Sequence, residues 1–356
     1  MREKPAVRST PRHVSVVAVA DATVSTLFGI YDVMSVFERM DPPGAGPAPF
    51  HVEIVGERVG PLALASGVTI EVHRAIDTID ATDIVIVPSV ELGPDGWTTG
   101  RYPQVTDWLK RMHERGALMC SACLGLFLLA ETGLFDGRDA TVHYNAAEIF
   151  AATYPAVSIH PERVLMISGV REELVSSGAS VAWHDLVLHL ISRFAGSAAA
   201  RDAARMYALQ WHHEGFTPYI VFAGRTGHGD AAIESAQHWL STHFSVASPV
   251  EQMLKPSKLA ERTFKRRFVI ATGLTPIVYV QRLRIEDAKK RLERTDAPVD
   301  EISWRVGYED PAFFRRLFKR TTGLAPAAYR KRFRIPDFAR PAAQSSQPRL
   351  SVPHSS

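Results

Sequence analysis

The stretch TGLTPIVY at residues 272–279 returns 50 residues later as TGLAPAAY at residues 322–329. Each copy follows a basic segment with two phenylalanines four positions apart, RTFKRRF at 262–268 and AFFRRLF at 312–318. Phenylalanines at this spacing share one face of a helix, so the Lys-Arg and Arg-Arg pairs between them face solvent. The glycine then ends each helix, and the proline prevents its continuation. The repeat therefore predicts two copies of one helical unit with a basic surface.

The residues before the second copy predict a helix-turn-helix. In VDEISWRVGYEDPAFFRRLFKR, at 299–320, Gly307 allows the positive φ of the turn, and Asp310 and Pro311 are good starting residues for the second helix. Arginines on the exposed face of that helix can reach guanine edges, and lysine suits phosphates. The helical pattern at 277–295 links the two copies and can hold them about 34 Å apart, one turn of DNA. We therefore expect two DNA-reading heads.

Charge is distributed unevenly along the 356 residues, which are enough for two domains. Residues 246–335 carry 21 Lys and Arg against 10 Asp and Glu, whereas residues 1–245 carry 18 against 27. A basic module joined to an acidic one indicates double-stranded DNA as the partner of the C-terminal part. The lack of a long apolar run and of a signal-peptide core predicts no membrane contact. The presence of only two cysteines predicts a cytoplasmic location.

The N-terminal part reads as an α/β domain. Apolar strand patterns alternate with helical patterns, as in a parallel sheet covered on both faces. We expect strands at 13–20, 51–58, 83–90 and 117–123, and later helices at 180–196, 198–211 and 230–244. The predicted boundaries are an α/β domain at 13–244, an all-α domain at 245–335, and disordered tails at 1–12 and 336–356.

Cys123 stands where a strand turns into a helix, and the start of a helix favours a thiolate. His143 follows 20 residues later, so a nucleophile and base pair is one interpretation. A small residue in a tight turn and a polar loop histidine are the alternative. Cys120 and Cys123 also form a C-x-x-C pair, which suits a thiol redox switch. With two cysteines we expect no disulfide framework, no metal site and no cofactor.

The C-terminal segment resembles the AraC family of transcription regulators over residues 248–334. The matching elements are RLRIEDAKKRL, EISWRVGYED, FFRRLFKR and TGLAPAAYR. The first head departs from the family pattern at Pro256, at Lys258 in place of the turn glycine, and at Ala260 in place of the Ser or Thr cap. The resemblance implies that bases are read by Arg262, Lys265 and Arg266 in the first head, and by Ala312, Arg315 and Arg316 in the second. We expect Lys319 to bind DNA through a phosphate.

The N-terminal segment resembles the PfpI-like branch of the class I glutamine amidotransferase-like superfamily, whose fold is a flavodoxin-like sandwich. The matching pieces are DIVIVPSV, GLFDGRDATVHY and SSGASVAWHDLVLHLISRFAG. The order of the two domains is that of the GlxA group of regulators. The resemblance places Asp32 where the enzymes carry a Glu, and puts Ser89 and Val90 where glycines supply oxyanion donors. It implies a degenerate, non-catalytic site that binds a small molecule through Asp32, Ser89, Cys123 and His143.

The expected protein is a sequence-specific transcriptional regulator that senses a small molecule, binds promoter or operator DNA as a homodimer and is associated with the nucleoid. Two other functions stay open from the sequence. One is a cysteine-dependent amidohydrolase with a DNA-binding arm, and the other is a thiol redox sensor.

Overall fold

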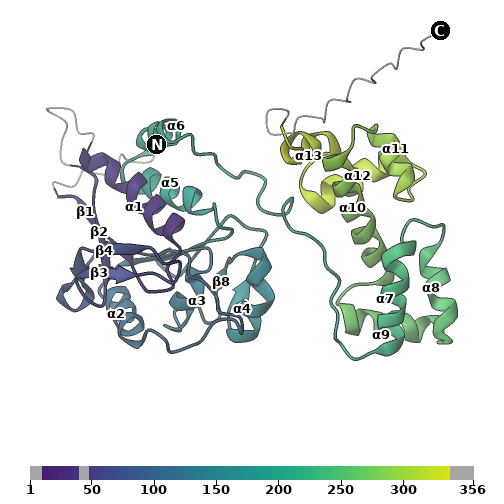
Figure 1. The fold of residues 1–356 in the computed structure, drawn as a ribbon, viewed down its shortest axis with the longest axis horizontal. Helices are drawn as coiled ribbons and strands as arrows, with labels where there is room; N and C mark the ends of the chain where they lie inside the picture. The colour runs from purple at the N-terminus through teal and green to yellow at the C-terminus, as the bar shows by residue number, and fades with distance from the viewer. Residues whose placement is uncertain (1–9, 40–47, 337–356) are drawn as a thin grey trace, which may run out of the picture. The chain divides into compact units, whose positions relative to one another are not determined.

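The chain forms two compact units, Met1–Ile220 and Val221–Ser356, in the computed structural model (Figure 1). The structure describes residues 10–39 and 48–336. The predicted disorder of residues 1–9 and 337–356 therefore lies outside the described residues. Arg12, which was expected in the N-terminal tail, instead begins the first strand.

The first unit is built on a mostly parallel sheet with the order β10-β11-β7-β6-β1-β2-β5 among the described residues. Adjacent strands of this sheet pair in parallel, except β10 and β11, which pair antiparallel. The strands are β1 (Arg12–Val17), β2 (Phe50–Gly56), β5 (Arg74–Ala75), β6 (Ile84–Val87), β7 (Leu118–Ala122), β10 (Leu165–Ser168) and β11 (Leu174–Ser177). Two further pairs, β3 (Gly60–Ala63) with β4 (Thr69–Val72) and β8 (Asp139–Ala140) with β9 (Ser158–Ile159), were not predicted.

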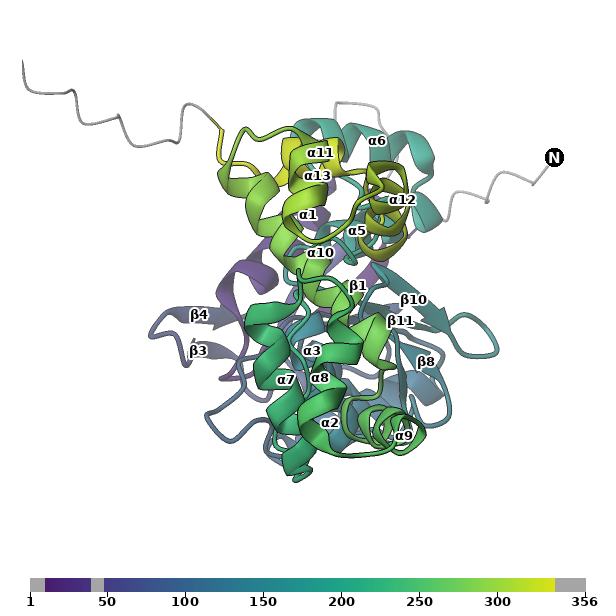
Figure 2. The same ribbon diagram turned by 90° about the vertical axis from the view of Figure 1, so that its right-hand side faces the viewer.

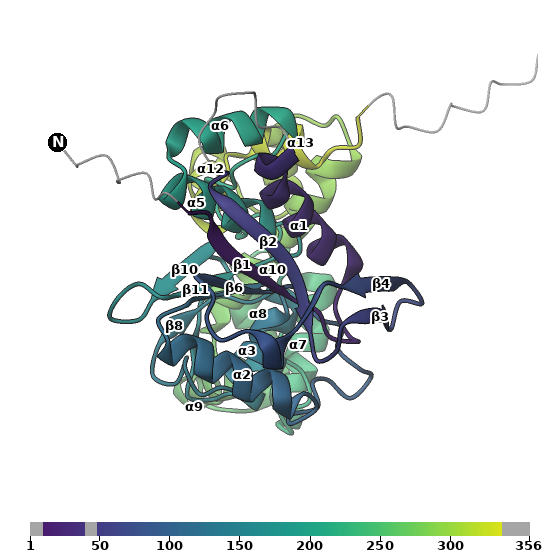
Figure 3. The same cartoon turned by 90° about the vertical axis from the view of Figure 1, so that its left-hand side faces the viewer.

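Helices cover both faces of this sheet, as Figure 3 shows. Helix α1 packs on β2 and against α5, which carries α6, while α2 and α3 pack on β7 and β6 on the other side. Every residue of β6 and β7 is buried, as expected for central parallel strands. The helices are α1 (Val24–Arg39), α2 (Pro103–Glu114), α3 (Gly125–Ala130), α4 (Ala147–Thr153), α5 (Trp183–Phe194) and α6 (Ser197–Met206), and two short 3-10 turns lie at Ile76–Thr78 and Tyr144–Ala146. The predicted flavodoxin-like sandwich is confirmed.

The second unit is helical (Figure 2). It has two separate cores. One surrounds Phe264 and Phe268, and the other surrounds Phe314 and Phe318. Its described helices are α7 (Ala231–His243), α8 (Pro249–Ser257), α9 (Glu261–Thr272), α10 (Pro276–Arg294), α11 (Val299–Arg305), α12 (Pro311–Thr322) and α13 (Pro326–Phe333). Helix α10 joins the two cores and is about 28 Å long at ~1.5 Å per residue over its 19 residues.

Helix α7 lies in the second unit, whereas the sequence prediction placed it in the first domain, 13–244. Its residues Ile233, Ala236 and Leu240 are buried in the same core as Phe264 and Phe268. The expected boundary near 244 is a short turn between α7 and α8. The long stretch without helix or strand is 207–230, and it spans the division between the units.

Candidate functional site

The repeated Thr-Gly-Leu sequence forms the same turn in both heads. The Thr272 hydroxyl donates to the Phe268 carbonyl at 2.7 Å and accepts from the Leu274 amide at 3.2 Å. Thr322 repeats both contacts, with the Phe318 carbonyl at 2.9 Å and the Leu324 amide at 3.2 Å. Gly273 and Gly323 take φ values of 74° and 79°, as a helix-ending glycine requires.

The tyrosine of each repeat fixes the following helix onto the preceding one. Tyr279 packs edge-on against Phe268 with ring centroids 5.3 Å apart, and Tyr329 packs against Phe318 at 5.5 Å. Both tyrosines are nearly fully buried. The repeat is therefore a pair of equivalent scaffolds that hold α9 and α12 in the same local geometry.

The turn of the second head matches its sequence prediction. Gly307 has φ 94°, and a Cβ added there would lie only 2.5 Å from the Ser245 carbonyl oxygen. The Asp310 carboxylate accepts a hydrogen bond from the Ala312 amide at 2.8 Å, which caps α12. Helix α12 then buries Phe314, Leu317 and Phe318.

The predicted DNA-binding side chains, six base-reading positions and the phosphate contact Lys319, all lie on exposed surfaces of α9 and α12. They are Arg262, Lys265 and Arg266 on α9, and Ala312, Arg315, Arg316 and Lys319 on α12. Lys265 pairs with Glu261, and Arg315 pairs with Asp300 of α11. Within the described part of the chain, the guanidinium of Arg316 donates no hydrogen bond, so it is free to meet a ligand. The individual base contacts of these residues stay predictions.

The three positions at which the first head departs from the helix-turn-helix family pattern lie between α8 and α9 or at the end of α8. Lys258 takes φ 52°, the left-handed conformation that its glycine counterpart Gly307 adopts without a steric penalty. Pro256 lies inside α8, near its end. Ala260 has the extended backbone of an N-cap residue but no side-chain oxygen to cap α9.

We expect Asp310→Ala to destabilise α12 by about 1 kcal/mol, because an amide at the start of the helix loses its acceptor. Ala260→Asp should stabilise α9 by a similar amount, since the backbone there is already extended. Hydrogen exchange of the full chain, read on peptides from α9 and α12, measures both. Unchanged exchange in α9 of Ala260→Asp would show that the missing cap does not limit the first head.

Arg284 is a structural residue that sequence reasoning missed. From α10 its guanidinium donates to the carbonyls of Phe244 at 2.7 Å, Val246 at 3.0 Å and Gly307 at 2.7 Å. It also lies over the Tyr308 ring, 5.0 Å from the centroid. It therefore joins the loop after α7 to the turn of the second head. The only sequence signal was an arginine in a helix whose neighbours are partly apolar.

In the first unit, the turn between β7 and α3 is a strained elbow. Cys123 takes φ 54°, and its amide donates to the Ser177 carbonyl at 2.9 Å. A Cβ on Gly125 would lie 2.3 Å from the Pro88 carbonyl oxygen, so α3 starts in direct contact with the end of β6. Strained conformations of this kind occur at functional sites. The elbow that the sequence predicted is present.

The Cys123 sulfur is enclosed by hydroxyl groups. It is 1% exposed and lies 3.7 Å from the Ser180 oxygen. Burial raises the pKa of the Cys123 thiol, and hydrogen bonds with Ser89, Ser180 and the Leu124 amide only partly oppose this. Burial also raises the pKa of Cys120, inside β7, well above its ordinary value. Both groups therefore favour the neutral thiol at neutral pH.

His143 does not act on the thiol in this structure. Its Nδ1 accepts a hydrogen bond from the Asn145 amide at 3.1 Å, and its ring packs on Tyr144 at 4.4 Å. Among the described contacts there is none between its nitrogens and the Cys123 sulfur. Burial lowers the pKa of His143, so its neutral form is favoured.

Asp32 lies outside the group at the elbow, contrary to the position expected for it. Its side chain is 57% exposed and pairs with Arg39 at 2.9 Å. The start of α1 is the part near the elbow, since the Thr23 amide donates to the Ser89 carbonyl. Asp32 is nine residues further on, roughly 13 Å along the helix. Of the four residues predicted to bind a ligand, Ser89 and Cys123 lie together at the elbow, and Ser180 joins them. His143 packs on Tyr144 instead of contacting the thiol.

The buried thiol leads to a reactivity prediction. We expect Cys123 to react slowly with iodoacetamide at pH 7 and faster only at pH values above the ordinary thiol range, because only the thiolate is nucleophilic. Alkylation of the full chain followed by peptide mass spectrometry measures this, with Cys123→Ser as the control. Rapid alkylation at pH 7 would contradict the environment described above.

The two units correspond to two known protein classes. Residues 17–181 match the DJ-1/PfpI family, and residues 256–332 match the family described as a helix-turn-helix domain. The chain thus joins a DJ-1/PfpI-type α/β domain to an AraC-type helix-turn-helix domain, which confirms the resemblance inferred from the sequence.

The chain is similar to two transcriptional regulators over more than half of its length. The chain is 25% identical over 263 residues to the HTH-type transcriptional regulator CdhR of Pseudomonas aeruginosa, covering 72% of this chain and 74% of that protein. It is 24% identical over 221 residues to the HTH-type transcriptional regulator GlxA of Rhizobium meliloti, covering 59% and 66%. A crystal structure of an AraC family transcriptional regulator from Pseudomonas putida aligns with 55% of this chain and 100% of its own, with 15% identity and a TM-score of 0.46.

Proposed function

We propose that this chain is a sequence-specific DNA-binding transcriptional regulator whose N-terminal unit senses a small molecule. The observation that carries the proposal is the pair of equivalent heads, each presenting an exposed basic helix held by the same turn. Helices of this kind enter the major groove, where arginine reads guanine and lysine neutralises phosphate. The names of the relatives CdhR and GlxA support the same function.

The elbow around Cys123 is the proposed sensing site, with Ser89, Ser180 and His143 as its polar groups. The segment that leads out of the first unit passes close to it. His212 donates its amide to Asp185 at 3.0 Å, and its ring meets the same buried carboxylate at 2.6 Å. Phe216 then packs with Ala179 and Ala182, on either side of Ser180. A ligand that displaces Ser180 would therefore disturb this segment.

The continuation of that segment is attached to the first DNA-reading head. Arg267 of α9 makes a two-pronged contact with Asp230, with distances of 2.8 and 2.7 Å. Gln237 of α7 donates to the Arg225 carbonyl at 2.9 Å and to the Tyr279 hydroxyl at 3.0 Å. Residues 221–230 thus form part of the first head, so the chain that leaves the sensing unit continues directly into a segment that contacts α9 through the Asp230–Arg267 ion pair.

A cysteine-dependent amidohydrolase is the second candidate, and the strained elbow is the observation that favours it. Burial of Cys123, which raises the pKa of its thiol, and the distant Asp32 argue against catalysis, and so does the hydrogen bond from Asn145 to His143. We therefore propose a non-enzymatic regulator. We further propose, from the family resemblance of the sequence, that it acts as a homodimer in the cytoplasm, at the nucleoid. Among the described residues no helix is long and apolar enough to span a membrane.

Genome-wide mapping of the DNA bound by the full chain tests the main proposal. We expect a small set of promoter-proximal sites that share two adjacent sequence elements, one for each head. Uniform binding without a shared sequence would contradict it. The neighbouring operons then indicate candidate effectors for titration.

The role of the elbow is tested by comparing the parent with Cys123→Ala over such an effector titration. We expect unchanged DNA affinity without effector and an altered response to it. An identical response would make Cys123 purely structural. Glutamine hydrolysis that Cys123→Ala abolishes would instead establish the amidohydrolase.

A further inference from the structure

We propose that a pocket at the amino-terminal edge of the sheet binds a small organic anion through its arginines. The pocket has a volume of about 530 Å³, within the range of small-molecule sites. It is formed where β1, β6 and β7 begin, whereas the Cys123 elbow follows the end of β7. It is therefore a separate site, and its test does not depend on DNA binding.

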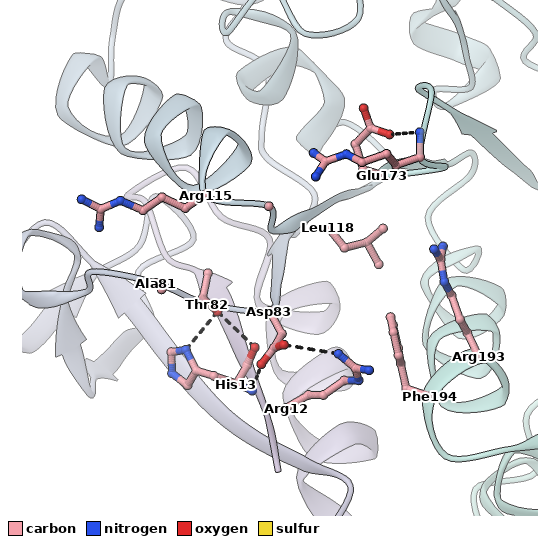
Figure 4. Close-up of a pocket in the computed structure, with 12 residues that line it drawn as sticks. Arg12, His13, Ala81, Thr82, Asp83, Arg115, Leu118, Glu173, Arg193 and Phe194 are labelled. Atoms are coloured by element: carbon pink, nitrogen blue, oxygen red, sulfur yellow. Dashed lines mark hydrogen bonds and ion pairs between the residues drawn. The ribbon is translucent and has the colours of Figure 1, made fainter. Parts of the chain in front are cut away.

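Several elements supply the walls of this pocket. Figure 4 shows side chains from separate parts of the fold around Leu118 of β7. They are Arg12 and His13 of β1, Asp83 before β6, Arg115 before β7, Glu173 before β11, and Arg193 and Phe194 of α5. Because rigid strands and one helix carry most of these groups, the pocket is largely preformed.

The charge balance of the lining favours an anion. Four arginines, the three above and Arg171, face two carboxylates. Both carboxylates already accept hydrogen bonds: Asp83 from Arg12 at 3.3 Å and from the His13 amide at 3.1 Å, and Glu173 from the Arg171 amide at 2.7 Å. The lining residues themselves thus keep an excess of two positive charges, although Arg115 is also paired at 3.5 Å with Asp80, which lies outside the lining.

Two of the arginines have donors to spare. Within the described residues, the guanidinium of Arg171 donates no hydrogen bond, and its Nη1 lies 3.8 Å from where a Cβ on Gly116 would be. Arg193 donates from Nη1 to the Glu172 carbonyl at 3.2 Å. A guanidinium has five N–H donors in a fork that matches a carboxylate or a phosphoryl group. These two side chains are the proposed anion ligands.

An aromatic wall positions the cations and accepts a carbon skeleton. The Arg12 guanidinium lies 4.3 Å from the centroid of the Phe194 ring, and that of Arg193 lies 5.5 Å from it. Cation–π contacts hold both arginines at the pocket. The proposed ligand is therefore a small organic molecule with a carboxylate or phosphoryl group and a compact apolar part.

Isothermal titration of the full chain at constant ionic strength tests this site, with citrate as the carboxylate probe and glycerol phosphate as the phosphoryl probe. We expect saturable binding of at least one probe, and the stronger of the two identifies the anionic group. Arg171→Ala and Arg193→Ala should each weaken it about tenfold or more, the usual effect of losing a charged hydrogen bond.

Arg163→Ala is the matched control, because Arg163 lies beside Gly178 at the other end of the β10–β11 hairpin. It should leave the affinity unchanged. Arg193→Lys keeps the charge but loses the fork, so it should bind more weakly than the parent even if Arg193→Ala does not fold. Absence of saturable binding by both probes, or an equal loss in the Arg163 control, would overturn the proposal.

Discussion

Arg316→Ala is expected to weaken binding to the mapped DNA site by about tenfold and to flatten the preference at one base position. The Arg316 side chain is exposed on α12, between the buried Phe314 and Phe318, and its guanidinium has no described protein partner. A guanidinium that pairs with O6 and N7 of guanine contributes about 1–3 kcal/mol of discrimination. Lys319→Ala should instead weaken binding to cognate and scrambled DNA alike. It should also reduce the slope of log affinity against log salt concentration by about one.

Binding titrations of both variants on cognate and scrambled duplexes at several salt concentrations separate these roles. Arg163→Ala, in the first unit, controls for the loss of a surface arginine. If Arg316→Ala loses equal affinity for both duplexes, Arg316 contacts phosphate only. If neither variant differs from the parent, α12 does not touch DNA and the proposed two-headed recognition is wrong.

Arg284→Ala is expected to destabilise the second unit by at least about 3 kcal/mol. Three carbonyls would lose a charged donor, and each such hydrogen bond is worth roughly 1.5–3 kcal/mol. Arg284→Lys should not rescue the loss, because an ammonium group cannot reproduce the planar fork. We expect faster hydrogen exchange in the α11 to α12 turn and weaker DNA binding, with exchange in the first unit unchanged.

Arg294→Ala is the matched control, since Arg294 is an exposed arginine on the same helix. Hydrogen exchange in Arg294→Ala should match that of the parent. If Arg284→Ala also exchanges like the parent, the three carbonyls are solvated without cost, and Arg284 does not fix the turn of the second head.

The features that could be predicted from the sequence depend on local geometry. The two heads followed from phenylalanines four residues apart, from Gly307, Gly273 and Gly323 at positive φ, and from the cap at Asp310. The parallel α/β sheet followed from apolar strands such as β6, and the flavodoxin-like sandwich followed from the family resemblance. In each case residues close in the chain carry the signal, because helix periodicity, caps and turns involve neighbours within a few positions.

Other features were decided only by tertiary structure. The pattern of α7 fits either unit, and its burial against Phe264 placed it in the second. Asp32 was expected near Cys123, but α1 carries it away from the elbow. Some roles depend on partners far away in the chain. Phe244 is 40 positions from Arg284, Asp230 is 37 from Arg267, and Asp83 is 71 from Arg12, one of the arginines around Leu118. The physical reason is that the direction of a side chain and its partner depend on how the elements pack, which no local pattern of residues specifies.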